Sequence, residues 1–258
     1  MQPPNRPWVA PGPAGGSPPH GPHAPSLPAS LPRRLLRLAA GQAVPLLALA
    51  VCAAGLLGFA LLADMLEDGE HRFDEALMLA LRQPGDAAQP IGPPWLALAM
   101  RDLTALGGIP VLGLLSLVAL GYLLLARQGR AALLLLVSLP GGLLLNTLLK
   151  QGFDRPRPAL VAHLVDVQTL SFPSGHAMLS AVGYLTLGAL LAGAAAQRRQ
   201  QGYIMGAAVL LVLLIGASRV YLGVHWPTDV LAGWCLGAAW AMGCWLVLQV
   251  SGWRRRDR

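Results

Sequence analysis

The sequence has few charged residues, and lysine is almost missing from it. Only 12% of its 258 residues are Asp, Glu, Lys or Arg, and 55% are hydrophobic, whereas soluble domains carry about 25% charged residues. Lys150 is the single lysine, so arginine supplies nearly all of the net charge of +7. This scarcity argues against a soluble domain. The arginines stand in short clusters between apolar runs, a pattern that fits membrane topology better than a nucleic-acid surface, so no nucleic-acid partner is expected.

Cysteine is also scarce, and its placement excludes two kinds of site. Cys52, Cys235 and Cys244 all lie inside apolar runs and lack the spacing of metal ligands or of paired loop cysteines. We interpret them as small buried hydrophobic residues. Carboxylates do not cluster in a way that would hold Mg²⁺ either. The sequence therefore predicts neither a metal nor a cofactor.

Long apolar runs, in contrast, are abundant. Six windows contain no Asp, Glu, Lys or Arg: 43–63, 108–126, 131–149, 177–196, 203–217 and 230–250. A helix needs about 20 residues to cross the bilayer core. Because the runs are rich in Leu and Ala and show no strict alternation, they favour helices over barrel strands. The sequence predicts an all-α fold, a bundle of six transmembrane helices that contacts the lipid bilayer.

The chain divides by composition into three parts. Residues 1–32 hold 11 of the 22 prolines and are expected to form a disordered tail, because such a stretch buries too little apolar surface to offset its chain entropy. Residues 33–250 form the predicted membrane domain, and residues 251–258 a basic C-terminal tail. Oligomeric state is left open.

The positions of the basic residues predict the orientation. With six spans, the side that holds both termini receives 12 Lys and Arg residues and the other side receives 7, so both termini are expected in the cytoplasm. The composition suggests a bacterial inner membrane. Within the first outer loop, 64–107, residues 72–82 place Phe73, Leu77 and Leu81 at four-residue steps. This pattern predicts a short helix that either lies on the bilayer surface or packs on the bundle.

Three segments at the ends of the spans carry unusual polar residues. They read LLKQGFDRPRPAL, FPSGHAM and ASRVYLGVHWPTDVLAG, and the predicted topology places all three on the outer face. Lys150, Arg155, Arg157 and Arg219 stand there beside spans, although the topology rule disfavours cations on that side. Long basic side chains can reach lipid phosphates from such positions. Their company of two histidines and an aspartate favours a site instead.

The second segment has the features of an anion site. Ser174 suits the N-cap of the helix that follows, and Gly175 exposes its backbone N–H. The N-terminus of a helix attracts anions through its free N–H groups and its dipole. A Ser-Gly pair is also an ordinary cap, but a cap alone has no need of His176.

The third segment pairs a histidine with an aspartate. Asp229 follows His225 by four residues, and Pro227 suits the first position of a helix. An Asp that accepts a hydrogen bond from one ring nitrogen fixes the tautomer and leaves the other nitrogen free to attack. Phosphoryl transfer requires positive charge around three oxygens, which Lys150, Arg157 and Arg219 can supply.

These three segments, taken in order, resemble the motifs of the type-2 phosphatidic acid phosphatase superfamily. The family pattern is K-x6-R-P, P-S-G-H and S-R-x5-H-x3-D, and the sequence matches it at Lys150 to Arg157, Pro173 to His176, and Ser218 to Asp229. The resemblance implies that Lys150, Arg157, Arg219, Ser174 and Gly175 bind the phosphate. It implies that His225 is the nucleophile, that Asp229 orients it, and that His176 exchanges protons with the leaving group and water. No metal is implied. The pair RPRP leaves Arg155 as a helper or a structural charge.

The resulting prediction is an integral, multi-pass membrane phosphatase with its site on the outer, periplasmic face. Its substrate would be a lipid phosphomonoester or diphosphate: phosphatidic acid, phosphatidylglycerol phosphate, undecaprenyl diphosphate or a lipid A phosphate. A lipid phosphotransferase could use the same phosphohistidine. A transporter is a further alternative, but its spans would carry more polar residues in their middle.

Overall fold

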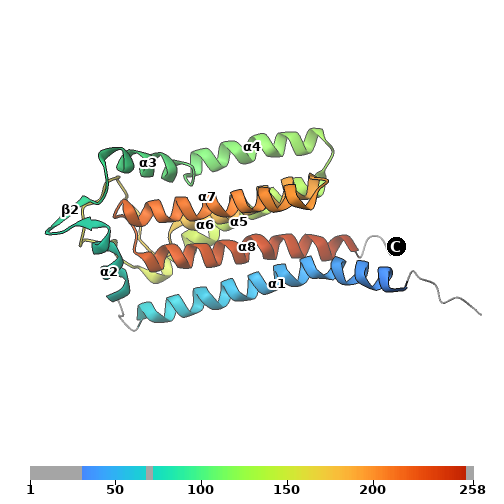
Figure 1. The fold of residues 1–258 in the computed structure, drawn as a ribbon, viewed down its shortest axis with the longest axis horizontal. Helices are drawn as coiled ribbons and strands as arrows, with labels where there is room; N and C mark the ends of the chain where they lie inside the picture. Colours follow the sequence, from blue (N-terminus) through green and yellow to red (C-terminus); the bar gives the residue numbers. More distant parts are fainter. Residues whose placement is uncertain (1–30, 68–71, 254–258) are drawn as a thin grey trace, which may run out of the picture. The chain divides into compact units, whose positions relative to one another are not determined.

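A computed structural model describes the backbone of residues 31–67 and 72–253 (Figure 1) and the side chains of residues 44–66 and 72–249. Most of the predicted N-terminal tail and of the basic C-terminal tail lies outside the described residues. The chain divides into two units, residues 1–41 and 42–258. The description below concerns the second unit.

Helices make up most of the described chain, as the all-α prediction requires. They are α1 (Leu31–Glu67), α2 (Arg72–Ala80), α3 (Pro94–Ala105), α4 (Ile109–Leu125), α5 (Gly129–Phe153), α6 (Gly175–Ala194), α7 (Arg198–Tyr221) and α8 (Pro227–Trp253). A two-stranded antiparallel sheet of β1 (Arg82–Gln83) and β2 (Asp86–Pro90) follows α2. The sequence did not predict this hairpin or α3, because both are short and lie in a loop without strong periodicity.

Five helices are long and apolar enough to cross a membrane, and α3 with α4 makes up to six when that bent pair counts as one span. The predicted run 108–126 corresponds to α4, which has 17 residues and meets α3 at an angle of 46°. Pro110 stands at the start of α4 and cannot donate to a helix that continues from α3. The structure therefore supports a multi-pass helical membrane protein, while the count of six and the cytoplasmic termini stay predictions.

Helix α6 is the most buried of the candidate spans and packs against α5, α7 and α8. Its approach to α8 depends on Gly233 and Gly237, where an added Cβ would lie 2.8 Å from Ser174 O and 2.6 Å from Met178 O. Small residues four positions apart allow such close helix contacts in membranes. The first residues of the two helices meet as a consequence, and Ser174 N donates to Asp229 O over 3.0 Å.

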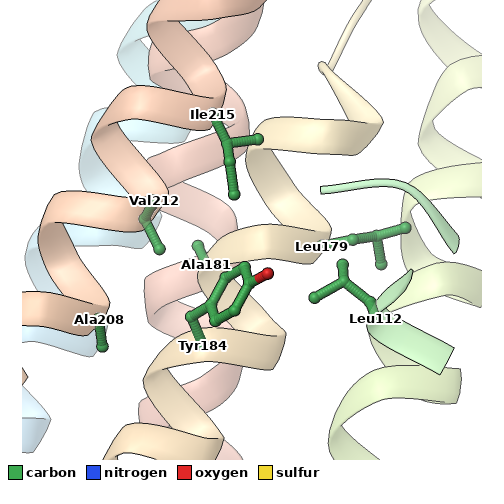
Figure 2. Close-up of a cluster of buried hydrophobic side chains, with 7 residues drawn as sticks. All are labelled: Leu112, Leu179, Ala181, Tyr184, Ala208, Val212 and Ile215. Carbon is green, nitrogen blue, oxygen red and sulfur yellow. The ribbon is translucent and has the colours of Figure 1, made fainter. Parts of the chain in front are cut away.

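A cluster of buried apolar side chains joins α6 to α4 and α7 (Figure 2). Its members are Leu112 of α4, Leu179, Ala181 and Tyr184 of α6, and Ala208, Val212 and Ile215 of α7. The Tyr184 hydroxyl donates to Leu106 O over 2.9 Å. This bond attaches the break between α3 and α4 to α6, close to the N-terminal segment that carries His176.

The predicted helix at 72–82 forms as α2, and one of its faces packs on the bundle. Asp74 and Met78 are buried, and Met78 contacts the cluster that includes Val230 of α8. Phe73 and Leu77, which the sequence placed on the apolar face with Leu81, are 52% and 41% exposed. The alternative in which the helix packs on the bundle thus holds for the face with Asp74 and Met78. The apolar pattern did not indicate that a charged residue, Asp74, would be buried on that face.

The turn between α7 and α8 has a fixed shape because of Gly223. Its φ is +78°, and an added Cβ would lie 2.6 Å from Ala162 O and 2.7 Å from Arg82 Nη2. A side chain would therefore be both strained and obstructed there. Arg82 Nη1 donates to Tyr221 O over 3.1 Å, which attaches β1, in the segment between α2 and α3, to this turn and so to His225.

Candidate active site

A cavity of about 490 Å³ gathers residues from all three motif segments. Six of the eight predicted site residues line it: Lys150, Arg157, Gly175, His176, Arg219 and His225. Ser174 and Asp229 are fully buried behind this wall. No acidic residue stands among the described residues that line the cavity, so its charged side chains are all basic.

His225 occupies the turn before α8 and has a defined tautomer. Its Nδ1 lies 3.3 Å from Asp229 Oδ2, and its Nε2 lies 3.2 Å from Arg157 Nη1. A carboxylate accepts and a guanidinium donates, so Nδ1 carries the proton and Nε2 holds the lone pair on the cavity side. Burial lowers the pKa of His225 to about 3, with the charges of Arg157 and Arg219 acting in the same direction and Asp229 opposing them. The imidazole is therefore neutral at physiological pH.

The loop before α6 positions two of the three cations. Arg157 donates through Nε to Thr169 O over 2.6 Å and through Nη2 to Thr169 Oγ1 over 3.1 Å. Lys150 Nζ donates to Leu170 O and, over 3.4 Å, to Thr169 Oγ1. Burial lowers the pKa of Arg157, while the charge of Asp229 raises it. Both side chains thus converge on the same loop at the cavity edge.

Arg219, the third cation, comes from the last turn of α7. Its Nη1 donates to Thr104 Oγ1 of α3 over 2.9 Å. Its Nε is buried and has no hydrogen-bond partner among the described side chains and backbone. A buried guanidinium with an unused donor can bind an oxyanion without first losing a protein contact.

The N-terminus of α6 is placed as the sequence predicted, although its cap differs. Ser174 is the N-cap residue, and the helix begins at Gly175. The Ser174 side chain makes no capping bond, and its buried Oγ has no partner within the described part of the chain. A Cβ on Gly175 would lie 3.1 Å from Asn146 Oδ1, so glycine keeps this end of the helix accessible. His176 extends toward the α3–α4 break, with Nε2 3.8 Å from a Cβ built on Gly108.

Arg155, which the sequence left as a helper or a structural charge, and polar groups that the sequence did not indicate surround Asp229. Its Oδ1 accepts from Arg155 Nη1 over 2.5 Å, and its Oδ2 accepts from Ser171 Oγ over 2.5 Å and from Trp226 N over 2.9 Å. Arg155 Nη2 also donates to Asp74 Oδ2 over 2.7 Å. Ser171 stands beside a motif, which is a weak signal. Asp74 lies far away in the sequence, and no motif or spacing marks it.

Metal ligands do not gather in the described part of the chain. No group of three or more His, Cys, Asp or Glu residues in residues 44–66 and 72–249 is arranged to hold an ion. The two buried carboxylates of the site, Asp74 and Asp229, are bridged by Arg155. The prediction of a metal-independent site stays a prediction.

Comparison with known proteins places this geometry in a family. The model of the PAP2 superfamily matches residues 131–253. Phosphatidylglycerophosphatase B of Bacillus subtilis is 37% identical over 154 residues, which cover 58% of this chain and 74% of that protein. Decaprenylphosphoryl-5-phosphoribose phosphatase of Mycobacterium tuberculosis is 37% identical over 150 residues, 57% of this chain and 76% of the relative.

A solved structure extends the similarity to a larger part of the chain. The crystal structure of the first transmembrane PAP2 type phosphatidylglycerolphosphate phosphatase from Bacillus subtilis superposes with a TM-score of 0.68 at 30% identity. The match covers 80% of this chain and 97% of that one. The resemblance expected from the three motifs is confirmed, and this chain belongs to the PAP2 superfamily.

Proposed function

We propose that this PAP2 membrane phosphatase hydrolyses a lipid phosphate through a phosphohistidine intermediate on His225. One observation carries the proposal. The unprotonated Nε2 of a buried, neutral imidazole lies beside a cavity that three cations line, and its Nδ1 is paired with a buried carboxylate. A nucleophile, an orienting base partner and a phosphate-binding wall are thereby assembled at one place.

In the first step, the Nε2 lone pair of His225 attacks phosphorus. A P–N bond forms as the bond from phosphorus to the lipid oxygen breaks. His176, which takes up a proton when the bound phosphate anion offsets the neighbouring cations, gives that proton to the leaving alkoxide. Asp229 stabilises the positive charge that develops on the imidazole. Lys150, Arg157 and Arg219 hold the three equatorial oxygens of the transferring group, where negative charge is spread in the transition state.

In the second step, water replaces the lipid alcohol. His176, now neutral, takes a proton from the water as its oxygen attacks phosphorus. The P–N bond breaks, its electron pair returns to Nε2, and inorganic phosphate leaves. Both histidines then have their starting protonation. Each proton transfer and each bond change is assigned to residues of this chain and to water, so the cycle is complete without a metal.

The cavity also suits a lipid rather than a soluble phosphate ester. Ile109 and Leu143 line it and are 58% and 36% exposed at their own positions, which gives an apolar path from the bilayer to the cations. The two named relatives act on phosphates of membrane lipids according to their names. We propose a lipid phosphomonoester such as phosphatidylglycerol phosphate or phosphatidic acid as substrate, with a lipid diphosphate as the variant to compare.

The orientation is part of the proposal. The arginine distribution supports cytoplasmic termini, and the three motif segments then open on the outer face of a bacterial inner membrane. Single cysteines placed at residues 195–202, in the loop between α6 and α7 and the first turn of α7, are expected to be shielded from an impermeant maleimide in intact cells of a variant free of its native cysteines. Labelling of that loop from outside would contradict the orientation.

The mechanism is tested with purified protein in detergent and ³²P-labelled lipid phosphate. His225→Ala should release no phosphate and form no labelled protein. His176→Ala should be slower by about 10²–10⁴-fold, the usual size of general acid–base catalysis, and should recover partly on an aryl phosphate whose leaving group needs no proton. It should also accumulate an acid-labile, base-stable phosphoenzyme.

His163→Ala is the matched control, because His163 lies in the loop that leads from α5 to α6 but outside the cavity lining. Exchanged phenotypes of the two site histidines would mean that His176 attacks. Transfer of label to an added alcohol, in place of release as phosphate, would favour a phosphotransferase.

A further inference from the structure

A buried network of three charged side chains, Asp74, Arg155 and Asp229, lies behind the cavity wall. Arg155 is 7% exposed, and its ion-pair partners Asp74 and Asp229 are 1% and 0% exposed. Arg155 donates through Nη1 to Asp229 Oδ1 over 2.5 Å and through Nη2 to Asp74 Oδ2 over 2.7 Å. The guanidinium thus bridges a carboxylate of α2 and the carboxylate of α8 that faces His225.

Thr228, at the start of α8, is hydrogen-bonded to this network. Its backbone N–H donates to Asp74 Oδ1 over 2.8 Å and its hydroxyl to Asp74 Oδ2 over 2.6 Å, while Arg155 Nη1 donates to Thr228 Oγ1 over 2.8 Å. Trp226 covers the guanidinium, whose Cζ lies 5.3 Å from the ring centroid. Asp74 therefore binds the first turn of the helix that carries Asp229.

Arg155 does not lie in the cavity wall, unlike Arg157 two residues later. Its donors are engaged with Asp74, Thr228 and Asp229. Arg157 instead contacts the reacting edge of the imidazole, with Nη1 3.2 Å from His225 Nε2. The contacts of the two arginines in the RPRP segment therefore indicate different roles for Arg155 and Arg157.

We propose that Asp74 and Arg155 are positioning residues for the phosphoryl transfer, which fix the Asp229 carboxylate so that Oδ2 faces Nδ1 of His225. Arg155 occupies Oδ1, and the remaining oxygen is left for Ser171, Trp226 N and the imidazole. Asp74 supplies the second anion that keeps the buried guanidinium in place, because a single buried carboxylate would leave half of its fork unpaired. Neither residue touches the substrate. This inference rests on the proposed nucleophilic role of His225.

Asp74→Asn tests the positioning role of this network, with Glu75→Gln as a matched control from the exposed side of the same helix. We expect Asp74→Asn to lower kcat by about 10–10²-fold, since a misplacement of about 1 Å can cost 10²-fold. The KM for the lipid phosphate should not change, because the cavity wall is intact. Arg157→Gln should instead raise KM, because it removes a phosphate contact.

A double-mutant cycle separates positioning from general support of the fold. When Asp229 is already Asn, Asp74→Asn should lower the residual rate little further, because the carboxylate that it orients is gone. Thr228→Val removes only the hydroxyl contacts to Asp74 and Arg155 and keeps both charges. It serves as a second variant where Asp74→Asn lowers the yield of folded protein, and it should lower kcat with the same unchanged KM.

The possible outcomes distinguish the two proposals. If the folded Asp74→Asn and Thr228→Val proteins keep the wild-type kcat, or if the two aspartate substitutions act additively, the positioning role is wrong. A rise of KM that accounts for the loss would make Arg155 and Asp74 part of phosphate binding and would also overturn it. A wild-type protein that forms no phosphohistidine would refute the proposed mechanism itself, independently of either variant.

Discussion

Asp229→Asn is the substitution for which the structure makes the sharpest prediction. It preserves the shape of the side chain and exchanges one oxygen for an amide NH₂. Every recorded partner of both oxygens is a donor: Arg155 Nη1 at Oδ1, and Ser171 Oγ, Trp226 N and His225 Nδ1 at Oδ2. The new amide nitrogen must therefore face a donor in either orientation.

The two orientations damage the site in different ways. With the nitrogen toward Arg155, the buried guanidinium loses one of its two carboxylates. With the nitrogen on the other side, His225 can accept at Nδ1 only if its proton moves to Nε2, which then has no lone pair for attack. The same substitution in a Ser-His-Asp triad lowers kcat by about 10⁴-fold through the wrong tautomer, and we expect about 10³–10⁴-fold here.

Stability should suffer as well. Removal of one partner from a buried ion pair costs about 3–5 kcal/mol. Asp74 still pairs with Arg155 over 2.7 Å, so we expect the lower end of this range, about 3 kcal/mol. The fold should survive at low temperature, and the kinetic effect can then be separated from unfolding.

The assay is release of phosphate from a lipid phosphomonoester in mixed micelles, with kcat and KM measured on protein that elutes as one symmetrical peak. Asp166→Asn is the control, because Asp166 is an exposed aspartate of the loop between α5 and α6 and does not line the cavity. It should retain the wild-type rate. An Asp229→Asn protein that is folded and retains more than about a tenth of that rate, a change under 1.4 kcal/mol, would refute the orienting role.

Four further predictions concern other parts of the molecule. Burial lowers the pKa of His225 to about 3, so below about pH 6.5 the unfolded chain binds a proton that the folded chain does not. The contribution of neutral His225 to the free energy of unfolding should be fully present above pH 6.5 and be lost as the pH falls toward 3. Melting temperatures should show this decline, and the decline should be less steep for His225→Gln. Gly237→Val should prevent the packing of α8 against α6 and so lower the yield of folded protein, since its Cβ would lie 2.6 Å from Met178 O. Gly121→Val, with open space around it, should be purified in normal yield. Activity should persist after EDTA dialysis, and loss that Mg²⁺ restores would contradict the metal-independent mechanism. Vanadate, a mimic of the pentacoordinate transition state, should inhibit, and insensitivity to it would argue against in-line transfer to His225.

Much of the site was predictable because its residues occur at helix ends. His225 and Asp229 are four residues apart across the start of α8, and the structure pairs them directly. Lys150 ends one span and Arg219 another, and the topology rule alone indicated that both reach the same face. The break before α4 was not predicted, because Pro110 lies inside an otherwise continuous apolar run and run length conceals it.

The support behind the site could not be predicted in the same way. Asp74 belongs to a short helix in which the sequence pattern indicated an apolar face at Phe73 and Leu77, yet a carboxylate is buried there because Arg155 and Thr228 satisfy it. Such a pairing depends on tertiary contacts between distant segments, which no local periodicity encodes. The role of Arg155 was left open for the same reason.

The helices and the loop before α6 hold the residues of the cavity in different ways. The α6–α8 crossing brings Ser174 N to Asp229 O, so backbone contacts fix the separation of the two histidine segments. Lys150 and Arg157, in contrast, donate to Leu170 and Thr169 of the loop before α6. In the proposed mechanism, phosphate oxygens compete with these acceptors for the same donors. Binding of substrate should therefore rearrange the contacts of residues 169–170 while the histidines keep their positions, since the acceptors on the loop can be exchanged and a helix crossing at glycine cannot.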